Sequence, residues 1–276
     1  MKERYNAGKF LLEIAMAVLA LLFLAPLYLV FINAFKRYDE VLSSTASLPE
    51  SFGLSNFITV WQQIHFPTAF LNSLMITVIS VLGILLVSSA AAYQIVRRPG
   101  KLSNIIFLTI LASMVIPFQT MMIPLLQVAK DFHLINSLYG IIIMYLGFGI
   151  PLALFLYHGF IKGIPIELEE AATIDGCNTF GVYFRILLPL LAPITTTIAI
   201  LHSLWIWNDF LLPYIVLGQK SNQTIPLASY VYFGEYMNEW HLALAALTMA
   251  VIPVIAFFLL MQRYIIQGIT AGAVKG

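Results

Sequence analysis

The segment ELEEAATIDGCNTFGVYFRILLPLLAP, from Glu167 to Pro193, differs sharply from the sequence around it. Long runs of Leu, Ile, Val and Phe precede and follow it, and only 10% of the residues in the chain are charged. The segment nevertheless carries the ionisable side chains of Glu167, Glu169, Glu170, Asp175 and Arg185. Because charged groups are costly inside a bilayer, we expect the segment to lie across a membrane face rather than through the membrane.

The composition indicates a membrane protein. Hydrophobic residues fill 61% of the 276 positions, whereas about a quarter of the residues of a typical soluble domain are charged. The formal net charge of +1 excludes a protein that binds nucleic acid through a basic surface. The single cysteine, Cys177, cannot form an internal disulfide, and no cluster with metal-ligand spacing surrounds it.

Six apolar stretches are long enough to cross a membrane, which takes roughly 20 residues of helix. The first of them is longer than the core of a secretory signal, which is about 7–15 residues, so we interpret it as a retained span. The sequence thus predicts an all-α membrane protein with one transmembrane domain, residues 1–276. Its predicted spans are 10–32, 70–96, 104–127, 137–158, 190–212 and 242–264.

The distribution of Lys and Arg predicts the orientation of these spans, because cytoplasmic loops carry an excess of both. With the N-terminus inside, the cytoplasmic side receives Lys2, Arg4, Lys9, Arg97, Arg98, Lys101, Lys162, Arg185, Arg263 and Lys275. The outer side receives Lys36, Arg37, Lys130 and Lys220. We therefore expect both termini and the segment Glu167–Pro193 in the cytoplasm, and the loops 33–69 and 213–241 outside.

The predicted spans contain few charged residues, chiefly Glu13, Asp209 and Arg263. Ionisable groups inside a membrane usually mark ion or proton pathways. Their scarcity argues against a carrier driven by an ion gradient. Backbone carbonyls also coordinate sodium, so such a carrier remains an alternative.

The first half of the charged segment has the features of a short helix followed by a reversal. Pro165 can open the helix, and glutamates in its first turns interact favourably with the helix dipole. Ala171 and Ala172 are small enough to let another surface approach closely. Asp175-Gly176 interrupts the helix, because Gly tolerates the left-handed backbone that a sharp reversal needs.

A second short helix is predicted from Thr179 to Leu188, before Pro189. Its apolar residues recur at helical spacing and predict an aromatic inner face made by Phe180, Tyr183, Phe184 and Leu187. The resulting helix-turn-helix fits an element inserted into a partner's groove. It equally fits a solvated loop of two interfacial helices, and the residues alone leave both open.

The stretch EEAATIDGCNTFGVYFRILLPLLAP resembles the signature loop of ATP-binding-cassette importer permeases. The positions in register with that loop are Glu170, Ala171, Ala172, Asp175, Gly176, Ile186, Leu188 and Pro189. A second stretch, QGITAGAVKG at 267–276, is similar to the C-terminal tail of carbohydrate-importer permeases of the maltose-importer type. FINAFK at 31–36 and WNDFLLP at 207–213 fit the same layout.

The resemblance implies the type I ABC importer permease fold, with six spans and a coupling helix-turn-helix, residues 165–189, between spans 4 and 5. In this family that loop docks into a cytoplasmic ATPase. Glu170 would pair with a basic ATPase residue, Ala171 and Ala172 would allow close approach, and Asp175-Gly176 would set the turn. Ile186 and Pro189 belong to the same coupling element. The tail residues implied to reach between ATPase subunits are Thr270, Ala271, Gly272, Lys275 and Gly276.

The chain has no G-x-x-x-x-G-K-[ST] phosphate loop, so it is not the ATPase. It is expected to be a transport subunit, not an enzyme, with no cofactor of its own and with ATP and Mg on the partner. The implied partners are a second permease chain, a dimer of ATPase subunits, an extracytoplasmic solute-binding protein and membrane lipid.

The expected cargo is a sugar, most simply a di- or oligosaccharide. Candidate residues along its path are Asn72, Gln119, His202, Asn208 and Asp209. Glycerol phosphate or another small solute is the alternative cargo, although an anion would favour basic groups that the spans hardly offer. The aromatic outer segment Gln219–His241 is a candidate surface for the binding protein or, equally, a set of interfacial aromatics.

Overall fold

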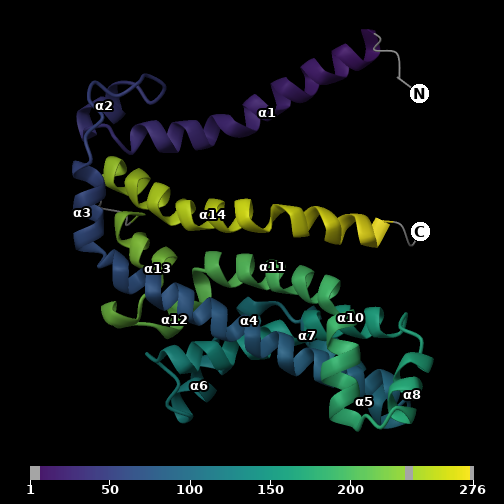
Figure 1. Cartoon of the computed structure of the whole chain (residues 1–276). Helices are drawn as coiled ribbons and strands as arrows, with labels where there is room; N and C mark the ends of the chain where they lie inside the picture. The colour runs from purple at the N-terminus through teal and green to yellow at the C-terminus, as the bar shows by residue number, and fades with distance from the viewer. Residues whose placement is uncertain (1–6, 234–238, 274–276) are drawn as a thin grey trace. The chain divides into compact units, whose positions relative to one another are not determined.

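A computed structural model describes residues 7–233 and 239–273, with side chains described up to residue 262. Within these ranges every regular element is helical, and no strand occurs (Figure 1). The expectation of an all-α fold is therefore confirmed for the described part of the chain. Two compact units are present, formed by residues 1–67 with 228–254 and by residues 68–227 with 255–276.

The first unit contains the N-terminal helix, the loop after it and a later part of the chain. Its described elements are α1 (Ala7–Asn33), α2 (Tyr38–Ser43), α3 (Ser55–Gln63), η4 (Tyr230–Phe233) and the first half of α14 (Trp240–Ala273). Nearly all side chains of α1 are exposed. That helix therefore leaves its apolar surface for lipid or for another chain.

The second unit holds most of the core. Its elements are α4 (Phe66–Arg97), α5 (Lys101–Ala112), η1 (Ser113–Val115), α6 (Phe118–Asp131), α7 (Leu138–Ile161), α8 (Glu167–Ile174), α9 (Thr179–Gly181), η2 (Val182–Leu187), α10 (Leu188–Leu190), α11 (Ala192–Asn208), α12 (Leu211–Val216), η3 (Lys220–Asn222) and α13 (Ile225–Ser229). The first residues of α4 and the last of α13 belong to the first unit. The core lies between α4, α7 and α11, with fully buried Ile84, Tyr157 and Ile198.

Four helices among the described residues are long and apolar enough to cross a membrane, and two bent pairs raise this number to six if each pair is one span. The predicted span 104–127 is not one straight helix, because the chain bends by 108° between α5–η1 and α6. Pro117 stands directly before α6, and a proline cannot continue the preceding helical hydrogen bonds. The span predicted at 190–212 is also not one continuous helix. The chain bends by 72° before α11, which ends at Asn208, and α12 is a separate helix. The orientation of the spans stays a prediction.

The loop after α1 is held by amide and ammonium groups that satisfy backbone carbonyls. Carbonyls at a helix C-terminus lack intrahelical partners. The Asn56 amide donates to the carbonyls of Ala34 and Lys36 at 2.9 and 2.8 Å. The buried Lys36 ammonium in turn donates to the carbonyl of Ser44 at 2.8 Å. These contacts fix the FINAFK stretch to the loop that follows it.

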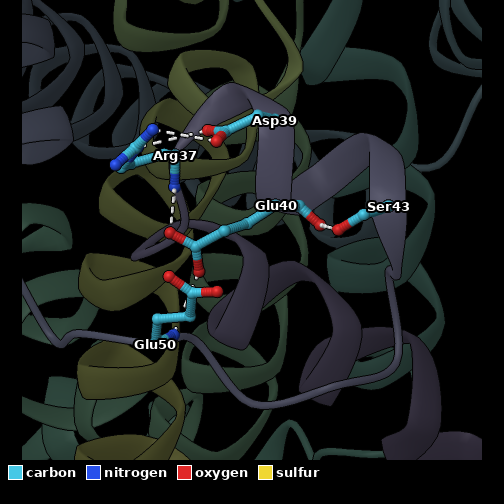
Figure 2. Close-up of polar contacts among 5 residues, drawn as sticks. All are labelled: Arg37, Asp39, Glu40, Ser43 and Glu50. Atoms are coloured by element: carbon cyan, nitrogen blue, oxygen red, sulfur yellow. Dashed lines mark hydrogen bonds and ion pairs between the residues drawn. The ribbon is translucent and has the colours of Figure 1, made fainter.

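A carboxylate organises the outer part of the same loop, as Figure 2 shows. Glu40 accepts the backbone N–H groups of Arg37 at 3.4 Å and Glu50 at 3.0 Å. The Arg37 guanidinium pairs with Asp39 at 2.8 Å, with both side chains mostly exposed. An exposed pair of this kind contributes only about 0–1 kcal/mol to stability. The bonds from backbone groups to Glu40 therefore do more to shape this loop than the ion pair.

Candidate functional site

The charged segment folds as two short helices joined by a tight reversal. The helix α8 is capped at its end by Asp175, and Gly176 has a left-handed backbone with φ +88°. Asn178 starts the second part, because its side-chain oxygen accepts the N–H of Gly181 at 2.8 Å. The reversal thus lies where Asp175-Gly176 predicted it, and the positive φ is the physical reason for glycine there.

Neighbouring residues of α8 have opposite environments because each residue of an α-helix is rotated by about 100° from the last. Glu169 and Ala172 are buried, whereas Glu170 and Ala171 are exposed. The expectation that both alanines form a surface for close approach is therefore corrected for Ala172, which packs inside this chain. Glu170 and Ala171 remain available on the outer face.

The buried side of α8 is attached to the end of α4. The Nε atom of Arg97 donates to Glu169 Oε1 at 2.7 Å, and Tyr93 Oη donates to Glu169 Oε2 at 3.0 Å. Arg97 Nη2 also donates to the carbonyl of Ile164 at 3.0 Å. The side chains of Arg97 and Glu169 are only 15% and 10% exposed. We call Arg97, Tyr93 and Glu169 the α4–α8 clasp.

This clasp was not predicted from the sequence, although the sequence contains a signal for it. Arg97 ends the second apolar run and lies on the same predicted side of the membrane as α8. Glu169 and Ala172 share one helix face at a spacing of three residues. A carboxylate on the same face as a small buried residue indicates an inward-facing acid that needs a cation nearby.

The second part of the segment contacts α4 as well. Val182–Leu187 forms a π-helix, a rare element that is frequent at functional sites. Its buried Tyr183 has its hydroxyl 2.7 Å from Ser89 Oγ and its ring centroid 5.6 Å from that of Tyr93. The expected inner face is correct for Tyr183 and Leu187 and wrong for Phe180 and Phe184, which are 75% and 54% exposed.

The exposed aromatics border a hollow of about 510 Å³ at the reversal. Polar groups and the two rings share its lining, which comprises Asp175, Gly176, Cys177, Asn178, Phe180, Gly181, Phe184 and Arg185. Ile186 is half-buried and Pro189 is exposed, and neither lines this hollow. The segment thus contains a hollow with both apolar and charged walls.

A larger cavity, of about 670 Å³, lies between η1, α6, α7 and α11. Most of its lining is apolar, and His202 and Trp205 reach it from α11. The ring nitrogens of His202 lie 3.0 Å from the Gly149 carbonyl oxygen and 2.9 Å from that of Ile198. His202 therefore ties α11 to α7 at the cavity wall. Gln119 and Asn208, by contrast, are exposed and do not line this cavity.

Asp209 lies at an adjoining hollow of about 190 Å³, which shares Phe118, Phe148 and Trp205 with the cavity. One of its carboxylate oxygens accepts from Tyr145 Oη at 2.9 Å and the other from the backbone N–H of Leu211 at 3.0 Å. The carboxylate thus holds the junction of α11 and α12.

Asn72 has a bonding role within the second unit. Its side-chain amide donates to the carbonyls of Ser221 and Gln223 at 2.8 and 3.0 Å, and neighbouring Ser73 accepts the N–H of Ile225 at 2.9 Å. These contacts fasten the segment after α12 to α4. The structure therefore brings His202 and Asp209 to one place and leaves Asn72, Gln119 and Asn208 elsewhere.

The aromatic outer segment has one buried and several exposed rings. Tyr232 donates to Gln63 Oε1 at 2.7 Å and is buried. Burial, together with the Glu239 carboxylate, raises the pKa of Tyr232 to about 12, so its hydroxyl stays protonated as a donor. Tyr230, Phe233 and Trp240 are exposed, and Tyr236 lies outside the described residues.

The tail predicted to contact the ATPase lies at the end of the chain. Thr270, Ala271 and Gly272 fall in the last turns of α14, whose side chains are outside the described part, and Lys275 and Gly276 lie outside the described residues.

Comparison with known proteins gives consistent results over most of the chain. Residues 83–271 match the family model described as binding-protein-dependent transport system inner membrane component. The probable starch degradation products transport system permease protein AmyC of Thermoanaerobacterium thermosulfurigenes is 45% identical over 273 residues, 99% of each chain. The melibiose/raffinose/stachyose import permease protein MelC of Bacillus subtilis is 36% identical over 261 residues, 94% of each chain.

A solved structure confirms the fold class. A chain in the crystal structure of a bacterial ABC transporter involved in the import of the acidic polysaccharide alginate superposes with a TM-score of 0.78. The match covers 95% of this chain and 99% of the other at 23% identity. These matches agree with the resemblance carried by the segment 167–193. The chain belongs to the family of binding-protein-dependent transport system inner membrane components, the permeases of ABC importers.

Proposed function

We propose that this chain is the permease subunit of an importer that carries a neutral di- or oligosaccharide into the cell. It lies in the prokaryotic inner membrane, as its family does. The observation that carries the proposal is the arrangement of α8. Its Glu170 and Ala171 are exposed on the surface, while its Glu169 binds Arg97 at the end of α4. Relatives whose names specify starch products or melibiose, raffinose and stachyose support a sugar as cargo.

The exposed face of α8 and the hollow beside it form the docking surface for a separate ATPase. Ala171 lets the partner approach closely, and the Glu170 carboxylate pairs with a basic residue of the ATPase. The partner holds ATP and Mg²⁺, and its closure displaces the segment 165–189. Conformational coupling of this type requires an element fixed to one body and moved by another.

The cavity between η1, α6, α7 and α11 is the part of the sugar path that this chain contributes. A second permease chain completes the path, and a solute-binding protein delivers the sugar from outside. Trp205 and Phe118 provide flat apolar faces at the cavity and at the hollow that holds Asp209. No Lys or Arg lines either space, which favours a neutral sugar over glycerol phosphate.

The test is purification of the tagged chain from its native membrane in mild detergent, followed by mass spectrometry of its partners. We expect an ATPase and a second permease to co-purify, and both uptake and ATPase association to be lost with Glu170→Lys. Glu50→Lys is the matched control, because Glu50 is an exposed acid in another loop. Uptake of labelled raffinose that survives ATP depletion and collapses with the ion gradient would overturn the proposal.

A further inference from the structure

The α4–α8 clasp joins two elements that are far apart in sequence. Arg97 is the last residue of α4, and its guanidinium binds both the Glu169 carboxylate and the carbonyl of Ile164 just before α8. One side chain thus holds the helix and the chain leading into it. A planar guanidinium with several fixed donors is suited to such a double contact, whereas a lysine ammonium is not.

The clasp is nearly closed to solvent, and this burial makes it stiff. Both charged side chains are at most 15% exposed, and Tyr93 occupies the second carboxylate oxygen. Separating a buried ion pair leaves two uncompensated charges, which is far more costly than separating an exposed pair. A displacement of α8 that kept this contact would carry the end of α4 with it.

A second, uncharged contact lies about two helical turns before Arg97 in α4. Ser89 meets the Tyr183 hydroxyl at 2.7 Å in a buried position, and the rings of Tyr93 and Tyr183 are adjacent. The coupling segment is consequently bonded to α4 from both of its halves. Along the chain, the segment follows α7 and continues into α10 and α11.

We propose that Arg97 and Glu169 are a positioning pair through which the coupling segment moves α4 together with α11. This inference rests on the proposed function, because it assumes that an ATPase displaces the segment. The two neighbouring glutamates then have separate roles. Glu170 contacts the ATPase and receives its motion, and Glu169 passes this motion to α4. The pair contacts neither sugar nor nucleotide.

The experiment uses the complete importer in proteoliposomes and measures sugar imported per ATP hydrolysed. Arg97→Gln and Glu169→Gln are each expected to lower this ratio about tenfold, a usual size for a coupling free energy. Association with the ATPase and basal hydrolysis are expected to stay. The double variant should lose no more than the worse single variant, because the two residues act as one pair. Arg98→Gln is the matched control, since Arg98 is the exposed neighbour.

A purely structural role would lower the amount of folded complex and leave the ratio unchanged, and this result would overturn the proposal. Additive losses in the double variant would overturn it as well. Tyr93→Phe removes a single hydroxyl and keeps the charges, so it is usable if the charge variants do not fold. It should lower the ratio about threefold, as expected for one hydrogen bond, and an unchanged ratio would contradict the proposal. A wild-type complex without an ATPase would instead overturn the proposed function itself.

Discussion

Arg97 and Glu169 are 72 positions apart in the sequence, and their side chains meet at 2.7 Å. Glu170, the next residue, is exposed on the other side of the same helix. One turn of α8 therefore contains an acid bound to the membrane domain and an acid open to a partner. This division gives the two adjacent glutamates, Glu169 and Glu170, different environments in a chain that otherwise avoids charge.

The two alanines of α8 should separate docking from folding. Ala171→Leu adds bulk to the exposed face, so we expect a well-folded chain that no longer retains the ATPase. Ala172→Leu adds the same bulk to a buried site, where overpacking costs about 1–3 kcal/mol. Co-purification of the ATPase and thermal unfolding in detergent measure the two effects. Equal loss of ATPase with equal thermal stability in both variants would refute the separation.

Replacement of Gly176 should be limited by its backbone angle rather than by a lack of space for a side chain. A Cβ at this residue would meet nothing within 4 Å, but φ is +88°. Gly176→Ala should lower uptake, because a left-handed backbone costs about 1–2 kcal/mol for an ordinary residue. Gly176→Asn should retain more uptake, since Asn tolerates this region, and Gly176→Pro should abolish uptake.

The control for Gly176 is Gly159→Ala, because Gly159 also has open space around it and has no positive φ. Uptake by this variant should equal that of the wild type. If Gly176→Ala and Gly159→Ala transport equally well, the backbone explanation fails.

Gly149 should be required for the close packing of α4, α7 and α11. A Cβ there would overlap the Cδ1 atom of Ile84 and lie 3.1 Å from Cδ2 of His202. Ile84 is fully buried, so its side chain would have to repack against its neighbours. Gly149→Ala should therefore lower the thermal unfolding temperature, with a cost of about 1–3 kcal/mol. Gly147→Ala, two residues earlier in open space, should not change it, and a similar fall in both would disprove the packing argument.

Asn72 should stabilise the fold rather than recognise the cargo. Asn72→Ala leaves the carbonyls of Ser221 and Gln223 without their side-chain donor, at a cost of about 1–3 kcal/mol. We expect faster proteolysis in the segment after α12 and an unchanged order of preference among sugars. Asn208→Ala removes only a bond to its own helix and should be nearly neutral for stability. A changed sugar preference in Asn72→Ala would place Asn72 back on the sugar path.

Much of the architecture was predictable because it depends on local patterns. The long apolar runs identified the helices α1, α4, α7 and α14, and the charged segment identified a helix, a reversal at Gly176 and a second short helix. The bends between helices were harder to predict from the sequence. Pro117 and the end of α11 interrupt runs that read as continuous in hydropathy, since hydropathy reports burial in an apolar medium and not helix direction.

The candidate site was only partly predictable, because its position follows from local residue types but the orientation of its side chains follows from tertiary packing. The segment 165–189 was found because its residue types are unusual in a membrane protein, whereas the orientation of each side chain depends on what packs against it. The sequence could not show that Ala172 is buried while Ala171 is exposed, or that Phe180 and Phe184 face outward. Asn72 and Asp209 were chosen as polar groups within apolar runs, and the structure shows that both bind other parts of the chain.

The sequence by itself determined the class of the protein, its long apolar helices and the position of the charged segment 167–193, because hydrophobicity, glycine and proline act locally along the chain. Only the tertiary structure decided which of the adjacent acids, Glu169 or Glu170, turns inward. That choice depends on Arg97 and Tyr93, which lie more than 70 residues away and reach Glu169 only when α4 and α8 pack together.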